Sequence, residues 1–199
     1  LLPSMLCPSD VGGTENYGGV QYTAVAAGRT NYLFCAGGHG NGWPGGREYS
    51  YYASSASNLP NGQTGIQYQG MFGYNGAAKF KAVRDGLSNS IAVTEGASNN
   101  RTNINAYTPI WASFRRHGIF AVNHPNIDAS HVNNSRYTLN GSVNPGDSRH
   151  HVNVASSVHE GGVHVLMGDG AIRFLSENMD RNTYFLLTRI HDSQVLGEF

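Results

Sequence analysis

The sequence predicts an α+β fold: mainly antiparallel β-sheet with long loops and a short C-terminal helix. Two observations support this class. Short runs in which apolar and polar residues alternate are separated by Gly, Asn and Pro, which is the pattern of half-buried strands. Helical spacing of apolar residues is clear only near the end of the chain. Because 199 residues with 39% hydrophobic content can bury one substantial core, we expect a single domain over residues 1–199, with a loose loop lobe at about 37–65.

Strands and loops follow from the same alternation. The long stretches between the strands are too polar to pack as helices, so we expect surface loops there. The strands are predicted at residues 20–26, 30–36, 48–53, 66–72, 90–95 and 118–123, and the loops at 37–46, 54–65 and 123–146.

A β-hairpin is the clearest local prediction. Two apolar runs, residues 163–167 and 171–175, flank Gly168-Asp169-Gly170, which is a strong turn signal. If Asp169 and Gly170 form a two-residue turn, the pairing places Val163, Val165 and Met167 on one face with Ile172 and Phe174.

A short helix is expected after the hairpin. Asn178 or Asp180 can cap a helix through residues 183–190, where Tyr184 and Leu187 have helical spacing. We expect this helix to cover the second face of the hairpin.

The charge pattern excludes two classes of partner. The 13 basic and 13 acidic residues give a formal net charge of zero and are scattered along the chain, so neither nucleic acid nor an anionic membrane is expected to bind. No apolar run approaches the roughly 18 residues that span a bilayer, so no membrane contact is expected from this fragment. Because the chain opens Leu-Leu-Pro-Ser-Met, we expect that an N-terminal piece has been lost.

The two cysteines, Cys7 and Cys35, each lie beside a predicted strand. A single disulfide between them could close a modest loop in an oxidising compartment. Two buried free thiols are the alternative.

Four landmarks together resemble the planctomycete-type prepilin-like proteins with an H-x9-D-G C-terminal domain. The fourth of them is His159 followed after nine residues by Asp169-Gly170. The other three, in chain order, are Leu6-Cys7-Pro8-Ser9-Asp10, Thr30-Asn31-Tyr32 followed by Gly37, and Asp85-Gly86-Leu87-Ser88-Asn89-Ser90-Ile91 ending at Glu95-Gly96. The departures are Leu87 and Ser90, where the family usually has Thr, and Glu160, which replaces a frequent proline.

The resemblance implies a pilin-like or pseudopilin-like head that is exported by a prepilin-type route and lies outside the cell or on its surface. Family members carry a long hydrophobic N-terminal helix that packs into a pilus-like bundle. The implied partners are copies of the chain itself or other pilin-like subunits. An architecture and a route are implied more firmly than an activity.

Histidines suggest a transition-metal site. The candidates are His150, His151, His159 and His164. His159 and His164 are five residues apart, which places them on opposite faces of a single strand unless the chain bends at Gly161-Gly162. Structural histidines that are hydrogen-bonded are the alternative.

The motif residues also have a structural interpretation. His159 is predicted to hold the turn at Asp169 and Gly170, which would make the hairpin a folding motif. Turn chemistry likewise accounts for Asp85, Gly86, Ser88, Asn89 and Glu95. The oxygens of Asp85 and Glu95 also suit Ca²⁺, which is the one cofactor considered, although the spacing is not that of an EF-hand.

Aromatic residues gather beside a Gly-rich loop: Trp43, Tyr49, Tyr51 and Tyr52. Such side chains suit subunit contacts, sheet packing or the faces of sugar rings. Glycans are therefore a further candidate partner.

Catalytic templates are missing, since the chain has no G-x-S-x-G, H-E-x-x-H or S-x-x-K motif. We therefore expect no enzyme but a structural subunit of a secreted pilus-like or other homopolymeric surface assembly. A glycan-binding adhesin and a secreted His-metal enzyme are the two alternatives.

Overall fold

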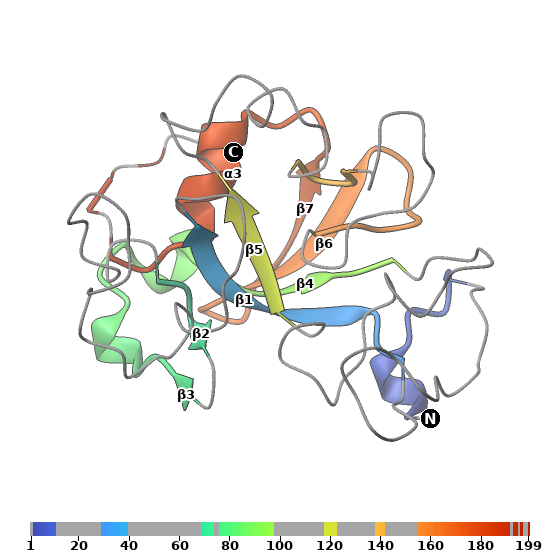
Figure 1. The fold of residues 1–199 in the computed structure, drawn as a ribbon, viewed down its shortest axis with the longest axis horizontal. Coiled ribbons are helices and arrows are strands. Elements are labelled where there is room, and N and C mark those ends of the chain that lie inside the picture. Colours follow the sequence, from blue (N-terminus) through green and yellow to red (C-terminus); the bar gives the residue numbers. More distant parts are fainter. Residues whose placement is uncertain are drawn as a thin grey trace.

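The computed structural model describes residues 2–10, 29–39, 69–73, 76–97, 118–122, 138–141, 155–191, 193, 194, 196 and 199. The strands are β1 (Tyr32–His39), β2 (Phe72–Gly73), β3 (Gly76–Ala77), β4 (Ile91–Glu95), β5 (Gly118–Val122), β6 (Gly162–Met167) and β7 (Ile172–Ser176). The helices are the 3-10 turns η1 (Pro3–Met5), η4 (Phe80–Ala82) and η5 (Leu87–Asn89) and the α-helix α3 (Arg181–Leu187) (Figure 1). Within these ranges no helix has the length and apolar character needed to cross a membrane.

One five-stranded sheet organises this part of the chain, in the order β5-β1-β4-β6-β7. The pairs β1–β4, β4–β6 and β6–β7 are antiparallel, and β5 adds to β1 in parallel. The predicted α+β class with a mainly antiparallel sheet is confirmed. The predicted strands at 30–36, 90–95 and 118–123 correspond to β1, β4 and β5, although β1 runs on to His39, into the predicted loop. The predicted strands at 20–26 and 48–53 lie outside the described residues.

The hairpin forms as expected, but the predicted register is wrong by one residue. The loop has three residues, Gly168 to Gly170, so that Met167 N–H donates to Ala171 O and Leu166 lies opposite Ile172. A one-residue slip moves a whole strand to the other face. Leu175, not Phe174, therefore joins the buried face of β6, and Phe174 and Ile172 point outward with 49% and 73% exposure.

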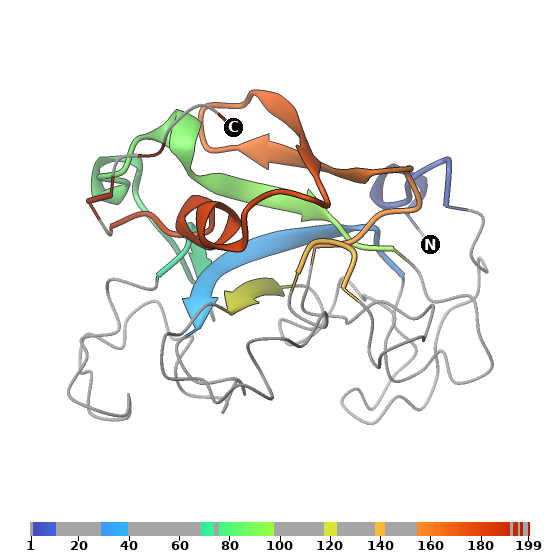
Figure 2. The same ribbon diagram turned by 90° about the horizontal axis from the view of Figure 1, so that it is seen from above.

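Helix α3 packs on the core face of the sheet. Asp180 caps it, as predicted, by accepting from Thr183 N at 2.9 Å. The helix begins at Arg181 and ends at Leu187, earlier at both ends than expected. The helix lies beside the sheet in the ribbon of Figure 2. Its buried side chains join one core with the inward residues of β1, β6 and β7: Tyr184, Phe185 and Leu187 with Leu33, Cys35, Val163, Val165, Met167 and Leu175. The expectation that the helix covers the second face of the hairpin was therefore wrong.

The opposite face of the sheet carries a line of apolar side chains in register. Phe34 lies opposite Val93, Val93 opposite Leu166, and Leu166 opposite Ile172. These four residues are called the apolar row below. Val93 also packs against a second, smaller core of Met71, Val83, Ala92 and Ile190.

Candidate functional site

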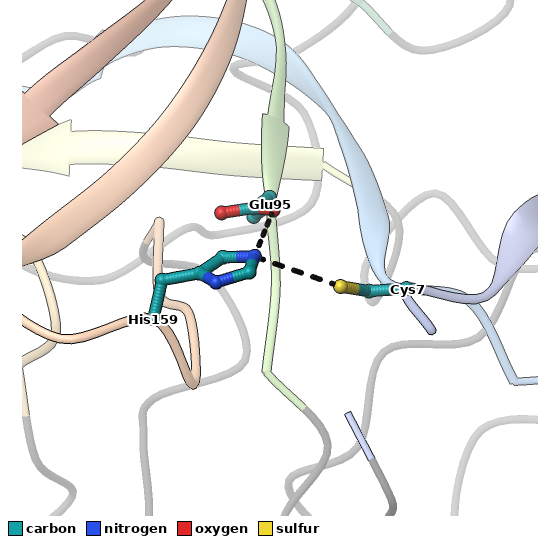
Figure 3. Close-up of side chains that lie close together, drawn as sticks. All are labelled: Cys7, Glu95 and His159. Carbon is teal, nitrogen blue, oxygen red and sulfur yellow. Dashed lines mark hydrogen bonds and ion pairs between the residues drawn. The ribbon is translucent and has the colours of Figure 1, made fainter. Parts of the chain in front are cut away.

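Three side chains from distant parts of the sequence meet at one end of the sheet (Figure 3). Cys7 follows η1, Glu95 is the last residue of β4, and His159 lies just before β6. Their donor atoms, one sulfur, one oxygen and one nitrogen, all lie within 4.8 Å of one another. Among the described residues this is the one group of three or more His, Cys, Asp or Glu side chains with such spacing.

A single ring nitrogen of His159 faces both of the other side chains. Its Nε2 lies 3.8 Å from Cys7 Sγ and 3.3 Å from Glu95 Oε1 (Figure 3). Cys7 and Glu95 are buried, whereas the His159 side chain keeps 31% of its surface exposed. Solvent therefore reaches this group of three side chains at His159, whereas Cys7 and Glu95 are enclosed by the protein.

The two oxygens of Glu95 have separate partners. Oε2 accepts from the backbone N–H of His164 at 2.8 Å, and the Nδ1 atom of the same histidine lies 3.5 Å away. Oε1 is left facing His159. The rings of His159 and His164 pack edge to face with their centroids 5.0 Å apart, because Gly161, with φ +83°, turns the chain between them. The bend that a shared site requires is therefore present.

Asn31 fixes the segment that carries Cys7. Its Oδ1 accepts from Cys7 N at 3.0 Å, and its Nδ2 donates to Asp10 Oδ2 at 2.6 Å and to Gly96 O at 3.0 Å. Asp10 also forms a buried ion pair with Arg29 at 3.8 Å. Since each of these groups is buried, their mutual hydrogen bonds replace those that water would supply.

Two serines complete the surroundings. Ser156 N donates to Glu95 O at 3.1 Å, and Ser157 Oγ accepts from His159 N at 3.2 Å. A small pocket lies beside the group, and its walls include Cys7, Asn31, Glu95, Ser156 and Ser157. These two hydrogen bonds thereby hold the backbones of Glu95 and His159 in place.

The geometry argues against a thiol-imidazole-carboxylate catalytic triad. In such a triad the nucleophile contacts one ring nitrogen and the carboxylate orients the other. Here the thiol and the carboxylate both face Nε2. The arrangement does not polarise the thiol through the ring; instead, it points three donor atoms toward one common space.

The other predicted metal candidates are distributed differently. His150 and His151 lie outside the described residues. His164 contacts Glu95 but is not a member of the three-residue group. Asp85 is at the far end of β4 from Glu95, and its Oδ1 accepts from Ser193 N at 2.8 Å, so the structure does not bring the proposed calcium pair together.

The aromatic residues predicted as glycan or assembly contacts lie outside the described residues: Trp43, Tyr49, Tyr51 and Tyr52.

The remaining motif residues form two turns that pack together. Asp169 Oδ1 accepts from Ala171 N at 2.9 Å, and Gly170 has φ +91°. Gly86, with φ +95°, begins the turn through Ser88 and Asn89, and Asn89 Nδ2 donates to Asp85 O at 3.2 Å. Gly168 N donates to Ser90 O at 2.8 Å, which joins the two turns.

His159 does not hold the hairpin turn. The six residues of β6 separate it from Gly168, and its contacts are to Cys7 and Glu95. The prediction that His159 acts on Asp169 and Gly170 was wrong, because the motif spans the length of β6 and places its two ends at opposite ends of that strand.

Both cysteines are free and buried, as in the second of the two sequence interpretations. Cys35 Sγ donates to Thr188 O at 3.4 Å in the main core, and burial raises the pKa of this thiol to about 12. Cys7 Sγ faces His159 instead. The disulfide between Cys7 and Cys35 does not form.

Sequence reasoning considered Cys7, Glu95 and His159 for three separate tasks and missed that they share one site. A signal was nonetheless present. Each of the four landmarks contributes a polar residue to this region: Cys7 and Asp10, Asn31, Glu95, and His159.

The comparison with protein families agrees with these landmarks. A family described as "Protein of unknown function (DUF1559)" matches residues 1–182, a range that contains all four of them. No curated protein and no solved structure matches the chain. Since the match covers nearly the whole sequence, the chain belongs to the DUF1559 family of planctomycete prepilin-like proteins.

Proposed function

We propose that the protein is a structural subunit of a secreted pilus-like or other homopolymeric surface assembly and that the apolar row is one of its contact surfaces. The family supplies the prepilin-like character. The observation that carries the proposal is the exposure of the row: Phe34 is 38%, Leu166 37% and Ile172 73% exposed.

The side chains of the apolar row lie next to one another across the sheet, so they form a contiguous patch and are not isolated surface hydrophobics. Isolated apolar side chains are normal on protein surfaces, whereas contiguous apolar patches mark interaction sites. The row crosses four strands, and the ring of Phe34 packs at a tilt against that of Phe72 with ring centroids 4.6 Å apart. In the neighbouring position on β7, Phe174 is 49% exposed and extends the patch.

The row ends on an edge strand. β7 is the last strand of the sheet, with β6 as its one neighbour. An edge that presents an apolar side chain is a surface on which another chain can pack or pair. The formal net charge of zero removes the general repulsion that keeps highly charged copies apart. A second copy of the chain is therefore the occupant we propose.

Self-association of the chain tests this proposal. Sedimentation velocity over a range of concentrations should show oligomers, and electron microscopy of concentrated protein should show ordered polymers. Ile172→Lys places a charge on the most exposed side chain of the row, so the dissociation constant of the variant should rise at least about tenfold, since that factor corresponds to only about 1.4 kcal/mol.

Phe80→Lys is the matched control. Phe80 is 69% exposed on η4 and does not belong to the apolar row, so a lysine there changes charge and apolar area without touching the contact. A wild-type chain that stays monomeric at high concentration would contradict the proposal. Equal association by the Ile172→Lys and wild-type chains would contradict the assignment of the surface.

An extracellular or cell-surface location belongs to the same proposal. It is supported by the prepilin-like family, which suggests secretion. The proposal includes no catalytic step.

A further inference from the structure

We propose that Cys7 Sγ, Glu95 Oε1 and His159 Nε2 bind one divalent transition-metal ion of the zinc class. The three donor atoms lie within 4.8 Å of one another at the end of β4. This inference is independent of the assembly proposed above, because the apolar row contributes none of the ligands.

The separations fit a tetrahedral ion. With Zn–S of about 2.3 Å and Zn–N or Zn–O of about 2.0–2.1 Å, tetrahedral angles place sulfur and nitrogen about 3.6 Å apart and nitrogen and oxygen about 3.3 Å apart. The observed distances are 3.8 Å from Sγ to Nε2 and 3.3 Å from Nε2 to Oε1. The third pair, Cys7 Sγ and Glu95 Oε1, lies within 4.8 Å, so these two atoms approach each other to about 3.6 Å when the ion enters.

Hydrogen bonding alone does not satisfy this arrangement. One ring nitrogen offers either one proton or one lone pair, so His159 Nε2 can bond to only one of its two neighbours in any protonation state. A cation at the centre accepts electron pairs from all three atoms. It also compensates a carboxylate whose side chain is only 10% exposed.

The surroundings are those of a metal ligand set. The backbone N–H of His164 holds Glu95 Oε2, which orients Oε1 toward the site. Asn31 fixes the backbone of Cys7, and Ser157 fixes that of His159. Outer partners of this kind hold the donors in place before the ion arrives.

The donor types select the ion. A thiolate and an imidazole favour Zn²⁺ and similar transition metals, whereas Ca²⁺ prefers six to eight oxygens. On binding, the Cys7 Sγ–H bond breaks, its proton passes to solvent, and the Sγ–metal bond forms. Three protein ligands leave a fourth position for water.

Metal binding by the purified chain is the direct test. After treatment with a chelator and desalting, the protein should take up one equivalent of Zn²⁺, measured by calorimetry and elemental analysis. Zinc at about 100 times its dissociation constant should raise the melting temperature by about 5–10 °C. Co²⁺ in place of Zn²⁺ should show the visible bands of a tetrahedral ion and a thiolate charge-transfer band.

Matched variants locate the ion. Cys7→Ser should abolish the charge-transfer band and His159→Gln should weaken Zn²⁺ binding at least tenfold. Cys35→Ser, which keeps a donor for Thr188 O, and His191→Gln should bind as the wild type does. The cobalt spectrum of the Cys35→Ser chain remains decisive even if Cys7→Ser does not fold, because that chain contains Cys7 as its only thiol.

Three results would overturn the proposal. The first is a wild-type chain that takes up no equivalent of Zn²⁺. The second is binding that persists unchanged in His159→Gln, which would place the ion elsewhere, for example at His150 and His151. The third is a cobalt complex with no thiolate band.

Discussion

At the scale of single residues, the two cysteines show how position decides the chemistry of one residue type. Cys7 lies beside an imidazole and a carboxylate at the rim of the fold, whereas Cys35 is enclosed by the core. Burial raises the pKa of the Cys35 thiol to about 12 and also raises that of the Tyr184 hydroxyl in the same core. Both groups are therefore kept neutral by the fold.

Alkaline pH should destabilise the protein for this reason. The Cys35 thiol has its ordinary pKa of 9.0 when unfolded and about 12 when folded, so the native state retains a proton that the unfolded chain releases. The stability that the protonated Cys35 thiol contributes is fully present below pH 9 and is lost as the pH rises toward 12. Urea unfolding should show the free energy of unfolding falling by up to about 1.4 kcal/mol per pH unit in this window.

Cys35→Ser provides the comparison, because serine does not titrate in this range. Its stability should fall less steeply than that of the wild type above pH 9. Identical slopes for the two chains would show that the thiol does not titrate as the structure implies.

At the scale of elements, local sequence predicted what is local. Alternation located β1 and β4, and Asp180 was one of the two caps predicted for α3, because strand periodicity and helix capping depend on adjacent residues. The helix itself begins two residues before the predicted start. The hairpin register was not predicted, since a loop of two residues and one of three leave the same apolar pattern in both strands. The packing of Leu175 in the core favours the register with a three-residue loop.

The hairpin loop supplies a prediction at this scale. Gly170 has φ +91° with open space where a Cβ would lie, so Gly170→Val should cost about 1–3 kcal/mol through backbone strain alone. Asp169→Asn keeps the side-chain oxygen that accepts from Ala171 N and should change stability by less than about 0.5 kcal/mol. Thermal or urea unfolding of the two variants measures both.

Gly162→Ala sharpens this test. A Cβ at Gly162 would collide with the backbone carbonyl of Leu175 across the β6–β7 pair, so its cost should exceed that of Gly170→Val. If Gly170→Val lowers the free energy of unfolding more than Gly162→Ala does, backbone strain in the loop is a larger cost than the collision between the two strands.

At the scale of the whole molecule, the candidate site depends on contacts that no local pattern contains. Cys7, Glu95 and His159 are separated by 64 residues or more in the sequence. The strand order brings Glu95 and His159 together, and the hydrogen bond from Cys7 N to Asn31 adds the third residue. Sequence analysis could find each residue as part of a landmark. It could not find the meeting point, because the loops and crossovers between the landmarks carry no periodic signal that fixes the path of the chain.

The charge balance of the whole molecule gives a further prediction. The formal net charge is zero with the nine histidines neutral, so acidification below about pH 6 gives the chain a charge of up to +9. Copies should then repel one another, and sedimentation at low salt should show smaller species at pH 5.5 than at pH 7.5.

Added salt distinguishes repulsion from unfolding. Because salt screens charge, about 0.5 M NaCl should restore association at the lower pH while circular dichroism stays unchanged. Association that does not recover with salt, or a folded chain that associates equally at both values, would contradict this account.

The anchoring of the first residues has a mechanical consequence. Asn31 N–H donates to Met5 O, and the Asn31 side chain bonds to Cys7 N and Gly96 O. Tension applied to the segment before Cys7 therefore enters the sheet at the start of β1 and the end of β4, two interior strands, and not at its edges. Such a load must break several hydrogen bonds at once before any strand peels away, which is what the proposed assembly would require of a subunit under tension.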